Sequence, residues 1–364
     1  MGEQHHALNA GRYTIFLGND SLNEISTLLK NGKFSGVFIL ADENSIQHCL
    51  PVLIAQVKKL SGAEIIEIES GEQNKNIDIA KQLWRTLGDL GADRKSLLIN
   101  LGGGVVSDLG GFVAATFKRG ITFVNIPTTL LAQVDASAGG KTGIDLDGIK
   151  NEIGVFAEPA MLCIYPDFLK TLPKREMLSG FAECLKHGLI TDKSYWLYLN
   201  EINIAEASCW NDVVRRSVEI KLEVVTEDPL EKGRRKILNF GHTIGHALES
   251  YFLENPQHSL LHGEAVAAGM ICEAWLSAEI CGLNAEELNE ITDAIALKYG
   301  YVHLDEMVAH RLLELMRHDK KNEKGALKFT LLKKIGEAVY NKTVSADQII
   351  HALDYYRSCA AHAK

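Results

Sequence analysis

Two histidines four residues apart, His242 and His246, are the first candidates for chemistry in this sequence. Their segment, NFGHTIGHALES, has the pattern of a helix, so both imidazoles share one face, which Glu249 continues. A catalytic zinc ion needs about three nitrogen or carboxylate ligands and one open position. Glu183 in GFAECLKHG and His262 in LLHGEAVAAG could complete such a set from two further helices. The spacing nominates both His242 and His246 and leaves open which one binds metal, and a single histidine is more often a hydrogen-bonded core or surface residue.

A glycine-rich turn, LGGGVVSDLGG, follows an apolar run and opens a helical pattern. In that context backbone N–H groups and the helix N-terminus can hold a pyrophosphate, because no Cβ keeps it away. Gly102, Gly104 and Ser107 give G-x-G-x-x-S, but the acidic ribose partner expected about 20 residues later is absent. Asp42, at the end of an earlier apolar run, could bind the ribose instead. Dinucleotide binding and a merely tight strand–helix turn both remain open at this point.

A second glycine–lysine segment, ASAGGKTGIDLDGIKNEIG, places Lys141 and Lys150 near Asp135, Asp145 and Asn151. It is not a P-loop, because the first glycine of that motif would fall at position 135, where an aspartate stands. By itself the segment is typical of a surface loop with solvated lysines.

The elements that must position these residues fall into two groups. Up to about residue 168, helical patterns alternate with six β-rich runs: YTIFL, GVFILAD, AEIIEIE, SLLINLGGG, ITFVNIPTT and MLCIYP. Beyond residue 175, apolar residues recur at helical spacing, apart from a short strand pair near LKFTLLKKIGEAVY. We therefore predict an α/β protein, with a Rossmann-like, mostly parallel sheet domain over 1–168 and a helical domain over 169–364. Ligands of an open α/β sheet bind beyond the carboxyl ends of its strands, so the site is expected between the two halves.

Composition excludes several classes of function. The 364 residues carry a formal net charge of −9, which argues against a nucleic-acid binder, because such affinity depends on clustered lysine and arginine. The 7 cysteines are scattered and never spaced C-x-x-C, so neither a disulfide framework nor a thiolate zinc site is indicated. Neither a signal peptide nor an apolar run of about 18 residues is evident. These features predict a cytoplasmic protein that does not enter membranes.

Taken together, the ordered motifs resemble the 3-dehydroquinate synthase family of sugar-phosphate cyclases. The resemblance covers nearly the whole chain and rests on GEQNK, GGGVVSDLGGFVAATFKRG, IPTTLLAQVDASAGGKTGID, GFAECLKHGLI, LNFGHTIGHALE, LHGEAVAAGM and DKKNEKG. One departure is the stretch ESYFLENPQHSLL between two of these motifs, which is longer than expected. It is expected to lengthen a loop, and His258 inside it to be a bystander.

The resemblance implies a role for each matching position. Zinc, with cobalt as an alternative, would be bound by Glu183, His242 and His262, while His246 would face the substrate. The catalytic groups would be His246, Lys141, Lys186, Asp135 and Asn151. NAD would be bound by Asp42, Glu72 to Lys75, Gly103, Gly104, Val105 and onward to Asp108, Thr128, Thr129, Lys141, Lys150, and Phe168 to Thr171. Substrate would be bound by Lys150, Lys221, Arg235, Asn239, a lysine of DKK (Lys320 or Lys321) and, across a dimer interface, Arg119.

The implied reaction converts 3-deoxy-D-arabino-heptulosonate 7-phosphate to 3-dehydroquinate and phosphate. It would proceed by transient NAD-dependent oxidation of a hydroxyl, elimination of phosphate, reduction and intramolecular aldol closure, in a homodimer acting on a small sugar phosphate. Sister cyclases that make a valiolone or an inosose share the NAD and zinc machinery and are the nearest rivals. A metal-dependent polyol dehydrogenase would release NADH, and a silent metabolite-binding protein would turn nothing over.

Overall fold

The computed structural model describes residues 6–147, 149–204, 206, 208–253, 259–305, 308–319 and 327–362. The chain divides into two compact units, and it passes between them more than once. The first unit comprises Met1–Pro173 and Ser208–Thr226, and the second comprises Lys174–Ala207 and Glu227–Lys364. The observed division differs from the predicted single boundary after residue 168, because the helical segment Ser208–Thr226 belongs to the first unit.

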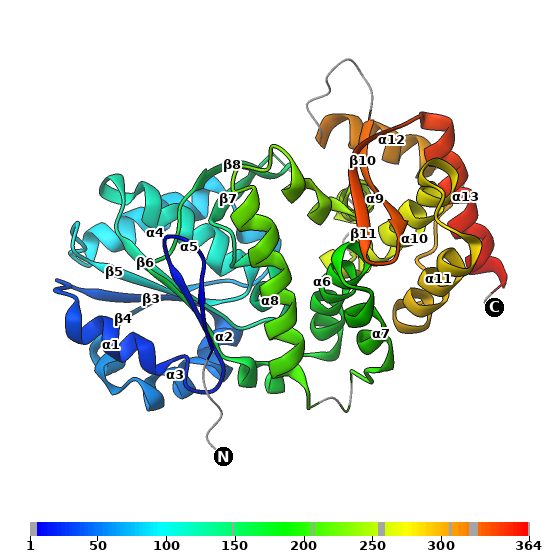
Figure 1. Ribbon diagram of the computed structural model, residues 1–364. Coiled ribbons are helices and arrows are strands. Elements are labelled where there is room, and N and C mark those ends of the chain that lie inside the picture. Colours follow the sequence, from blue (N-terminus) through cyan, green and yellow to red (C-terminus); the bar gives the residue numbers. More distant parts are fainter. Residues whose placement is uncertain are drawn as a thin grey trace. The chain divides into compact units, whose positions relative to one another are not determined.

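A seven-stranded sheet forms the centre of the first unit (Figure 1). Its order is β1-β2-β9-β6-β5-β3-β4, and every neighbouring pair is parallel except β1 with β2. The strands are β1 (His6–Asn9), β2 (Thr14–Leu17), β3 (Val37–Asp42), β4 (Glu64–Ile68), β5 (Leu97–Gly102), β6 (Thr122–Pro127) and β9 (Met161–Ile164). All residues of β5 and β9 are buried, as expected for parallel strands covered on both faces. The predicted mostly parallel sheet is confirmed.

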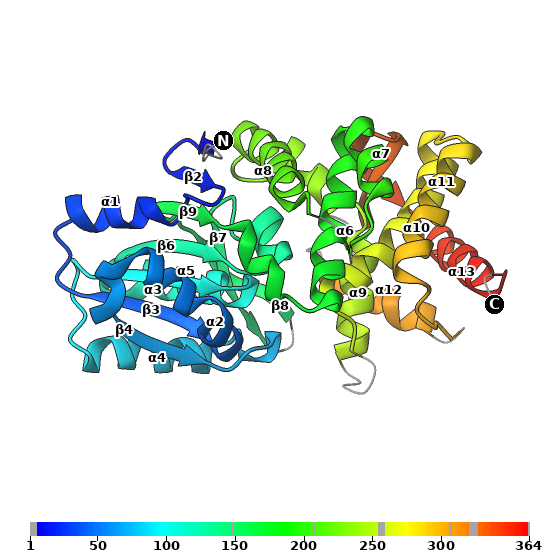
Figure 2. The ribbon, with the colours of Figure 1, turned by 90° about the horizontal axis from the view of Figure 1, so that it is seen from below.

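Helices cover both faces of this sheet because its strands alternate their side chains between two apolar clusters. Ile39 of β3 packs in the cluster formed with α1 (Asn23–Asn31) and α3 (Leu50–Gln56). Its neighbour Leu40 packs in the opposite cluster, with α4 (Ile77–Asp89) and α5 (Gly104–Thr116). Figure 2 shows these helices together with the short α2 (Glu43–His48) around the sheet.

Two further elements of the first unit carry candidate residues. The glycine–lysine segment forms an antiparallel hairpin, β7 (Lys141–Leu146) and β8 (Ile149–Phe156), where a surface loop was expected. Helix α8 (Trp210–Glu227) supplies Ser208–Thr226, the part of the unit that lies far along the chain.

The second unit is mainly helical. Its elements are α6 (Lys174–Thr191), α7 (Lys193–Glu201), α9 (His242–Leu253), α10 (His262–Cys281), α11 (Ala285–Tyr299), α12 (Val308–Asp319), α13 (Ala346–His362) and the expected strand pair β10 (Leu327–Lys334) and β11 (Glu337–Val344). Helix α10 is buried along most of its length. Its glycines permit backbone contact with two neighbours: a Cβ at Gly263 would lie 2.0 Å from the carbonyl of Ser179 on α6, and one at Gly269 would lie 2.0 Å from that of Gly241 before α9.

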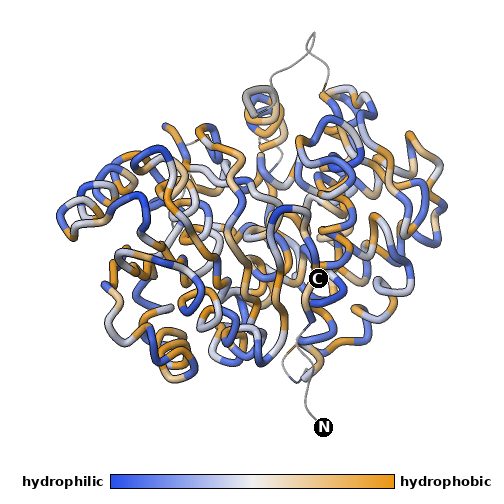
Figure 3. Tube along the Cα trace, turned by 60° about the vertical axis from the view of Figure 1, so that its left-hand side comes forward, coloured by the Kyte–Doolittle hydropathy of each residue, from blue (hydrophilic) through white to orange (hydrophobic). Residues whose placement is uncertain are grey.

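Hydrophobic and hydrophilic residues alternate over short distances along the coloured part of the trace (Figure 3). In the part of the chain that the structure describes, we find no helix with the length and apolarity that crossing a bilayer would need.

Candidate metal and cofactor sites

Glu183 is the centre of the candidate metal site in the second unit. It lies in the middle of α6 and is fully buried, which is rare for a carboxylate that lacks a compensating partner. Neither of its oxygens accepts a hydrogen bond of good geometry from the described residues. Lys186, one helical turn onward and equally buried, forms an ion pair with Oε2.

Two imidazoles converge on the other oxygen of this carboxylate. Nε2 of His242, the first residue of α9, lies 3.3 Å from Oε1 of Glu183. Nε2 of His262, the first residue of α10, lies 3.3 Å from the same atom. One ligand atom from each of the three residues lies within 4.8 Å of the others. Two nitrogens and one carboxylate oxygen therefore face a common point, as ligands of a catalytic zinc ion do.

Each of the two histidines is held at its other ring nitrogen. Nδ1 of His242 lies 3.0 Å from the carbonyl oxygen of Phe240, and Nδ1 of His262 lies 3.4 Å from Oε2 of Glu249 on α9. A carbonyl oxygen cannot donate, so this contact is a hydrogen bond when Nδ1 of His242 carries the proton, the tautomer in which Nε2 keeps its lone pair for a metal ion. A carbonyl or carboxylate behind each imidazole is the usual arrangement for metal ligands, because it fixes the tautomer and the ring plane.

Charges in this cluster shift the pKa values strongly. Burial alone would raise the pKa of Glu183, but Lys186 and His242 hold it well below its usual range. Burial lowers the pKa of His242 to about 4, and the Lys186 ammonium acts in the same direction. Burial would also lower the pKa of His262, but Glu249 and Glu183 raise it to about 10. A divalent ion suits this donor set, because Oε1 of Glu183 accepts no hydrogen bond from the described residues although both imidazoles face it.

His246 lies beside the metal trio, the three candidate ligands Glu183, His242 and His262. Its ring centroid is 5.2 Å from that of His242 and 5.9 Å from that of His262. With Glu249 and His262 it forms a second group whose ligand atoms are close enough for a metal. The two groups share His262, so geometry alone does not assign His246 to the metal or to the substrate.

The predicted substrate residues of the second unit lie on the turn before α9, within the 3₁₀ helix η6 (Arg234–Asn239). Arg235 is buried and donates to the carbonyl of Pro229 at 2.7 Å. Asn239 donates to Oε1 of Glu231 at 2.7 Å. The sequence reasoning did not select Glu231, which stands in a stretch of mixed charges with no spacing signal. Lys320, Lys321 and His258 lie outside the described residues.

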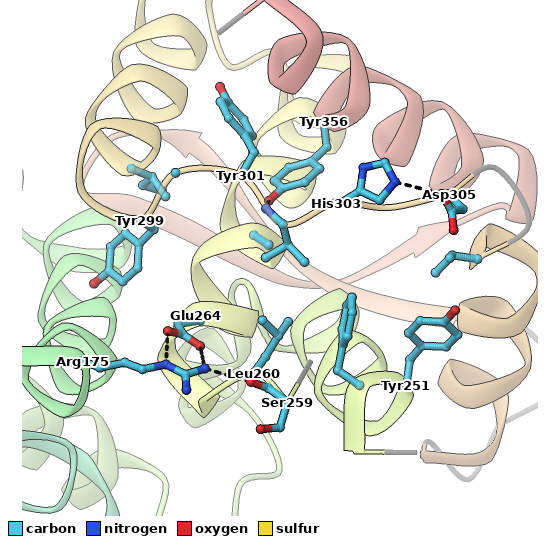
Figure 4. A pocket seen from close by; sticks show the side chains of 16 residues that line it. Arg175, Tyr251, Ser259, Leu260, Glu264, Tyr299, Tyr301, His303, Asp305 and Tyr356 are labelled. Atoms are coloured by element: carbon cyan, nitrogen blue, oxygen red, sulfur yellow. Dashed lines mark hydrogen bonds and ion pairs between the residues drawn. The ribbon is translucent and has the colours of Figure 1, made fainter. Parts of the chain in front are cut away.

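A pocket of about 1040 Å³ is lined by residues around the start of α10, among them Leu260 and Glu264, and by none of the predicted site residues. Arg175 of α6 forms a bidentate ion pair there with Glu264, at 2.7 Å for both bonds (Figure 4). Arg175 also donates to the carbonyl of Ser259 at 2.8 Å. These bonds tie the start of α10, and with it His262, to the helix that carries Glu183.

The candidate cofactor site of the first unit lies at the carboxyl ends of adjacent strands. Gly103 follows β5 and precedes α5, whose first turn presents unpaired N–H groups. A Cβ on Gly103 would lie 3.1 Å from the side chain of Thr129, which follows β6. Asp42 ends β3, accepts from Ser45 N at 2.8 Å and caps α2. The hydroxyl of Ser45 is 3.4 Å from that of Thr128. The structure thus brings these predicted cofactor residues to one sheet edge, where dinucleotides bind in such folds.

A buried lysine links other predicted residues of the first unit. Lys75 is only 4% exposed, and its ammonium lies 2.8 Å from Glu72, 3.4 Å from Asp108 and 3.7 Å from Asp145. It also donates to Oδ1 of Asn151 at 2.9 Å. Burial would lower the pKa of Lys75, but the surrounding carboxylates raise it. Burial raises the pKa of Asp108 to about 6 despite the nearby ammonium.

The hairpin β7–β8 supplies the remaining members of this cluster. Lys150 lies 3.4 Å from Glu72, and Asn151, with φ of +52°, donates its backbone N–H to Asp145 at 2.8 Å. The lysines of the glycine–lysine segment are therefore not equivalent, because Lys150 is half-buried in the cluster and Lys141 is exposed at the start of β7.

Asp135 and Lys221 form a pair within the first unit. Lys221 of α8 is buried and donates to the backbone oxygen of Asp135 at 2.5 Å and to Oδ1 at 2.7 Å. Arg119 is exposed, with φ of +71°, after α5. Phe168 packs in the hydrophobic core, and Thr171 donates to its carbonyl at 3.3 Å. A cofactor contact at Phe168 would therefore use its main chain.

Comparison with known proteins places these residues in a family. Models described as 3-dehydroquinate synthase N-terminal and C-terminal match residues 65–179 and 180–322. A 3-dehydroquinate synthase of Parabacteroides distasonis is 44% identical over 346 residues, which cover 94% of this chain and 97% of that protein. That of Acetivibrio thermocellus is 37% identical and covers 90% and 91%.

Solved structures agree in fold. The 2-epi-5-epi-valiolone synthase of Streptomyces hygroscopicus, solved with NAD⁺ and Zn²⁺, has a TM-score of 0.82 and 25% identity, over 98% of this chain and 100% of that one. A 2-deoxy-scyllo-inosose synthase, solved with carbaglucose-6-phosphate, NAD⁺ and Co²⁺, has a TM-score of 0.83 at 22% identity, over 97% and 99%, and supports the fold alone. The two family models and the relatives of 37% and 44% identity show that this chain belongs to the 3-dehydroquinate synthase family, and the metal trio and the glycine turn agree with this.

Proposed function

We propose that this protein converts 3-deoxy-D-arabino-heptulosonate 7-phosphate to 3-dehydroquinate and phosphate, with NAD and zinc as cofactors. One observation carries the proposal: Nε2 of His242 and Nε2 of His262 both lie 3.3 Å from one oxygen of the buried Glu183. A zinc ion held by these three residues would keep a fourth position open for a substrate oxygen. Membership of the family supplies the substrate, because the relatives of 37% and 44% identity are 3-dehydroquinate synthases.

The residues divide between holding the cofactors and handling the substrate. Glu183, His242 and His262 would hold zinc, while the turn at Gly103 and the carboxylate of Asp42 would hold the pyrophosphate and a ribose of NAD. When bound, NAD supplies a hydride acceptor that later returns the hydride, and zinc supplies a Lewis acid for the hydroxyl that is oxidised.

The cationic side chains would bind the anionic groups of the substrate. Arg235 presents a planar guanidinium suited to a carboxylate, and Lys150 and Lys221 present point charges suited to phosphate oxygens. Each is buried or half-buried, so little of its charge is screened by water. An acidic protein would in this way keep a locally basic site.

Proton transfer is the role we assign to His246. An imidazole can accept a proton at one ring nitrogen and donate one from the other, and the ring of His246 lies beside those of His242 and His262. His246 could therefore take the proton of the hydroxyl that is oxidised and return it at the reduction step. Asp135, Asn151, Lys141 and Lys186 would orient the substrate and balance charge around it.

We further propose that the protein acts in the cytoplasm as a homodimer in which Arg119 reaches the phosphate bound by the partner. All seven cysteines are free in the structure, which is compatible with a reducing compartment.

Incubation with the heptulosonate phosphate, Zn²⁺ and a catalytic amount of NAD⁺ tests the proposal, with phosphate release and absorbance at 340 nm followed together. Phosphate release without net NADH is the expected result. Accumulating NADH would instead identify a polyol dehydrogenase. The absence of turnover would indicate a metabolite-binding protein without catalytic activity. Turnover of a different sugar phosphate, with none of the heptulosonate, would identify a sister cyclase.

A further inference from the structure

Glu273 is a buried carboxylate that the proposed chemistry does not use. It lies in the middle of α10 and is fully buried. Its two oxygens accept hydrogen bonds from the start of a different helix, α9: Oε2 from Gly241 N at 2.7 Å and Oε1 from Ile244 N at 3.1 Å. Gly241 has no side-chain oxygen to cap this helix, so Glu273 supplies the cap from the neighbouring element.

The Gly241 N–H belongs to the peptide group that also contains the carbonyl of Phe240. That carbonyl oxygen lies 3.0 Å from Nδ1 of His242 and can accept a hydrogen bond from the Nδ1–H tautomer. One peptide group is therefore bonded at its N–H to a carboxylate and at its C=O to an imidazole that faces Glu183. The chain of bonds runs from Glu273 through the peptide to His242, and each bond polarises the next.

The backbone at Gly241, which follows this peptide, packs closely against α10. Gly241 has φ of +79°, and a Cβ there would lie 2.5 Å from Met270 Cγ and 3.1 Å from the carbonyl of Val266 on α10. Gly245, one turn into α9, is packed as closely, since its Cβ would lie 3.0 Å from the Cα of Val266. Glycines allow the two helices to meet at their backbones, and Glu273 sets the direction of the peptide at that contact.

We propose that Glu273 is a positioning residue for the metal ligand His242. Through the Phe240–Gly241 peptide it fixes the Nδ1–H tautomer and the ring plane of His242 and increases the electron density at Nε2. The inference rests on the metal site of the proposed function. It goes beyond that function in assigning a role to a residue that contacts neither metal nor substrate.

The other histidine of the site provides a direct comparison. Nδ1 of His262 lies 3.4 Å from a carboxylate oxygen of Glu249, without an intervening peptide. Both histidine ligands are thus backed by a buried carboxylate, one directly and one through a peptide. A negative charge behind an imidazole strengthens it as a ligand, and loss of such outer partners typically weakens metal affinity about 10–100-fold.

The simpler alternative is that Glu273 only caps α9 and stabilises the fold. Three variants separate the two roles. Glu273→Gln removes the charge and one acceptor. Glu279→Gln makes the same change at an exposed position of the same helix. Ser277→Ala removes two other buried bonds one turn along α10 and leaves the Glu273 carboxylate intact: the bond accepted from Leu332 N at 2.9 Å and the bond donated to the backbone carbonyl of Glu273 at 2.6 Å.

Affinity for Zn²⁺ is measured by competition with a chelator at fixed pH, folding and Tm by circular dichroism, and ligand geometry by the visible absorption bands of the Co²⁺-loaded protein. Glu273→Gln is expected to weaken Zn²⁺ binding about 10–100-fold and to change the Co²⁺ bands. Glu279→Gln should do neither. Ser277→Ala should lower Tm by several degrees, as loss of buried hydrogen bonds does, with Zn²⁺ affinity near that of the wild type.

Two results would overturn the inference. One is a Glu273→Gln variant with the Zn²⁺ affinity and Co²⁺ bands of Glu279→Gln, and the other is an equal loss of affinity in Glu273→Gln and Ser277→Ala. If Glu273→Gln does not fold, Glu273→Asp is compared with Glu279→Asp, and equal affinities then count against the inference. A wild-type protein that binds no divalent ion would refute the metal site itself, and the role of Glu273 would fall with it.

Discussion

The ammonium of Lys75 lies 2.9 Å from the side-chain oxygen of Asn151, 76 positions away. Three carboxylates, those of Glu72, Asp108 and Asp145, lie within 3.7 Å of the same ammonium, which is 4% exposed. Lys75→Met would leave these carboxylates without their common counter-charge. We expect a loss of about 3–5 kcal/mol in the free energy of unfolding at pH 7.5, measured by urea denaturation of the cofactor-free protein.

The loss should shrink on acidification, because the Lys75 ammonium lowers the pKa of Asp108 and its removal lets that carboxyl take up a proton in the folded state. Lys170→Met is the matched control, since Lys170 is 73% exposed and pairs with Asp167 at 2.8 Å. Lys170→Met should lower the free energy of unfolding by at most about 1 kcal/mol. Equal losses in the two variants would contradict the buried-cluster interpretation.

Asp108 itself should reduce stability at neutral pH. Burial raises the pKa of Asp108 to about 6 from its usual value of 3.8, so between these values the folded protein binds more protons than the unfolded chain. Its contribution to stability therefore falls as pH rises through this window and stays low above it. Asp108→Asn resembles the protonated form, and we expect it to gain on the order of 1–3 kcal/mol at pH 7.5 and little at pH 4. A gain that did not grow with pH in urea denaturation would refute this.

The two overlapping metal groups make opposite predictions for two single substitutions. If Glu183, His242 and His262 bind the ion, His242→Ala should lose tightly bound zinc, whereas His246→Ala should keep it and turn over more slowly. Zinc content after dialysis, measured by atomic emission, decides between them. Retention of zinc by His242→Ala with loss in His246→Ala would assign the ion to the group formed by His246, Glu249 and His262.

Gly269 should tolerate no side chain. A Cβ there would lie 2.0 Å from the carbonyl oxygen of Gly241 and 2.8 Å from the backbone nitrogen of Gly245, so Gly269→Ala must push α9 away from α10. We expect a loss of at least about 3 kcal/mol in stability together with weaker zinc binding, because His242 and His262 begin these helices.

Gly282 is the control for that substitution. It ends α10 with φ of +77° and open space around it, so Gly282→Ala should cost only about 1 kcal/mol, through backbone strain, and leave zinc affinity unchanged. Thermal unfolding and chelator competition on the two variants test the pair. A Gly269→Ala protein as stable as Gly282→Ala would show that the helices can separate at little cost.

Most of the sheet could be predicted because its central strands β9, β6, β5 and β3 are mostly buried. All six β-rich runs became strands, since continuous apolar runs such as β5 leave few alternatives once both faces are covered. The hairpin β7–β8 was missed for the opposite reason: nearly every residue of β8 is exposed, so no apolar alternation marks it. The helical pattern of α8 was visible, but its place in the first unit was not, because amphipathicity shows that a helix packs and not against what.

The sequence by itself determined the family, the fold class and the residue types of both candidate sites, because ordered motifs and apolar periodicity are local properties of the chain. Only the tertiary structure decided which nitrogen of each histidine faces Glu183, which carboxylates surround Lys75, and that Glu273 reaches the helix of His242. Most of these contacts join residues that are tens of positions apart in the sequence. They form only when the helices and strands pack against one another, so the spacing of residues along the chain does not predict them.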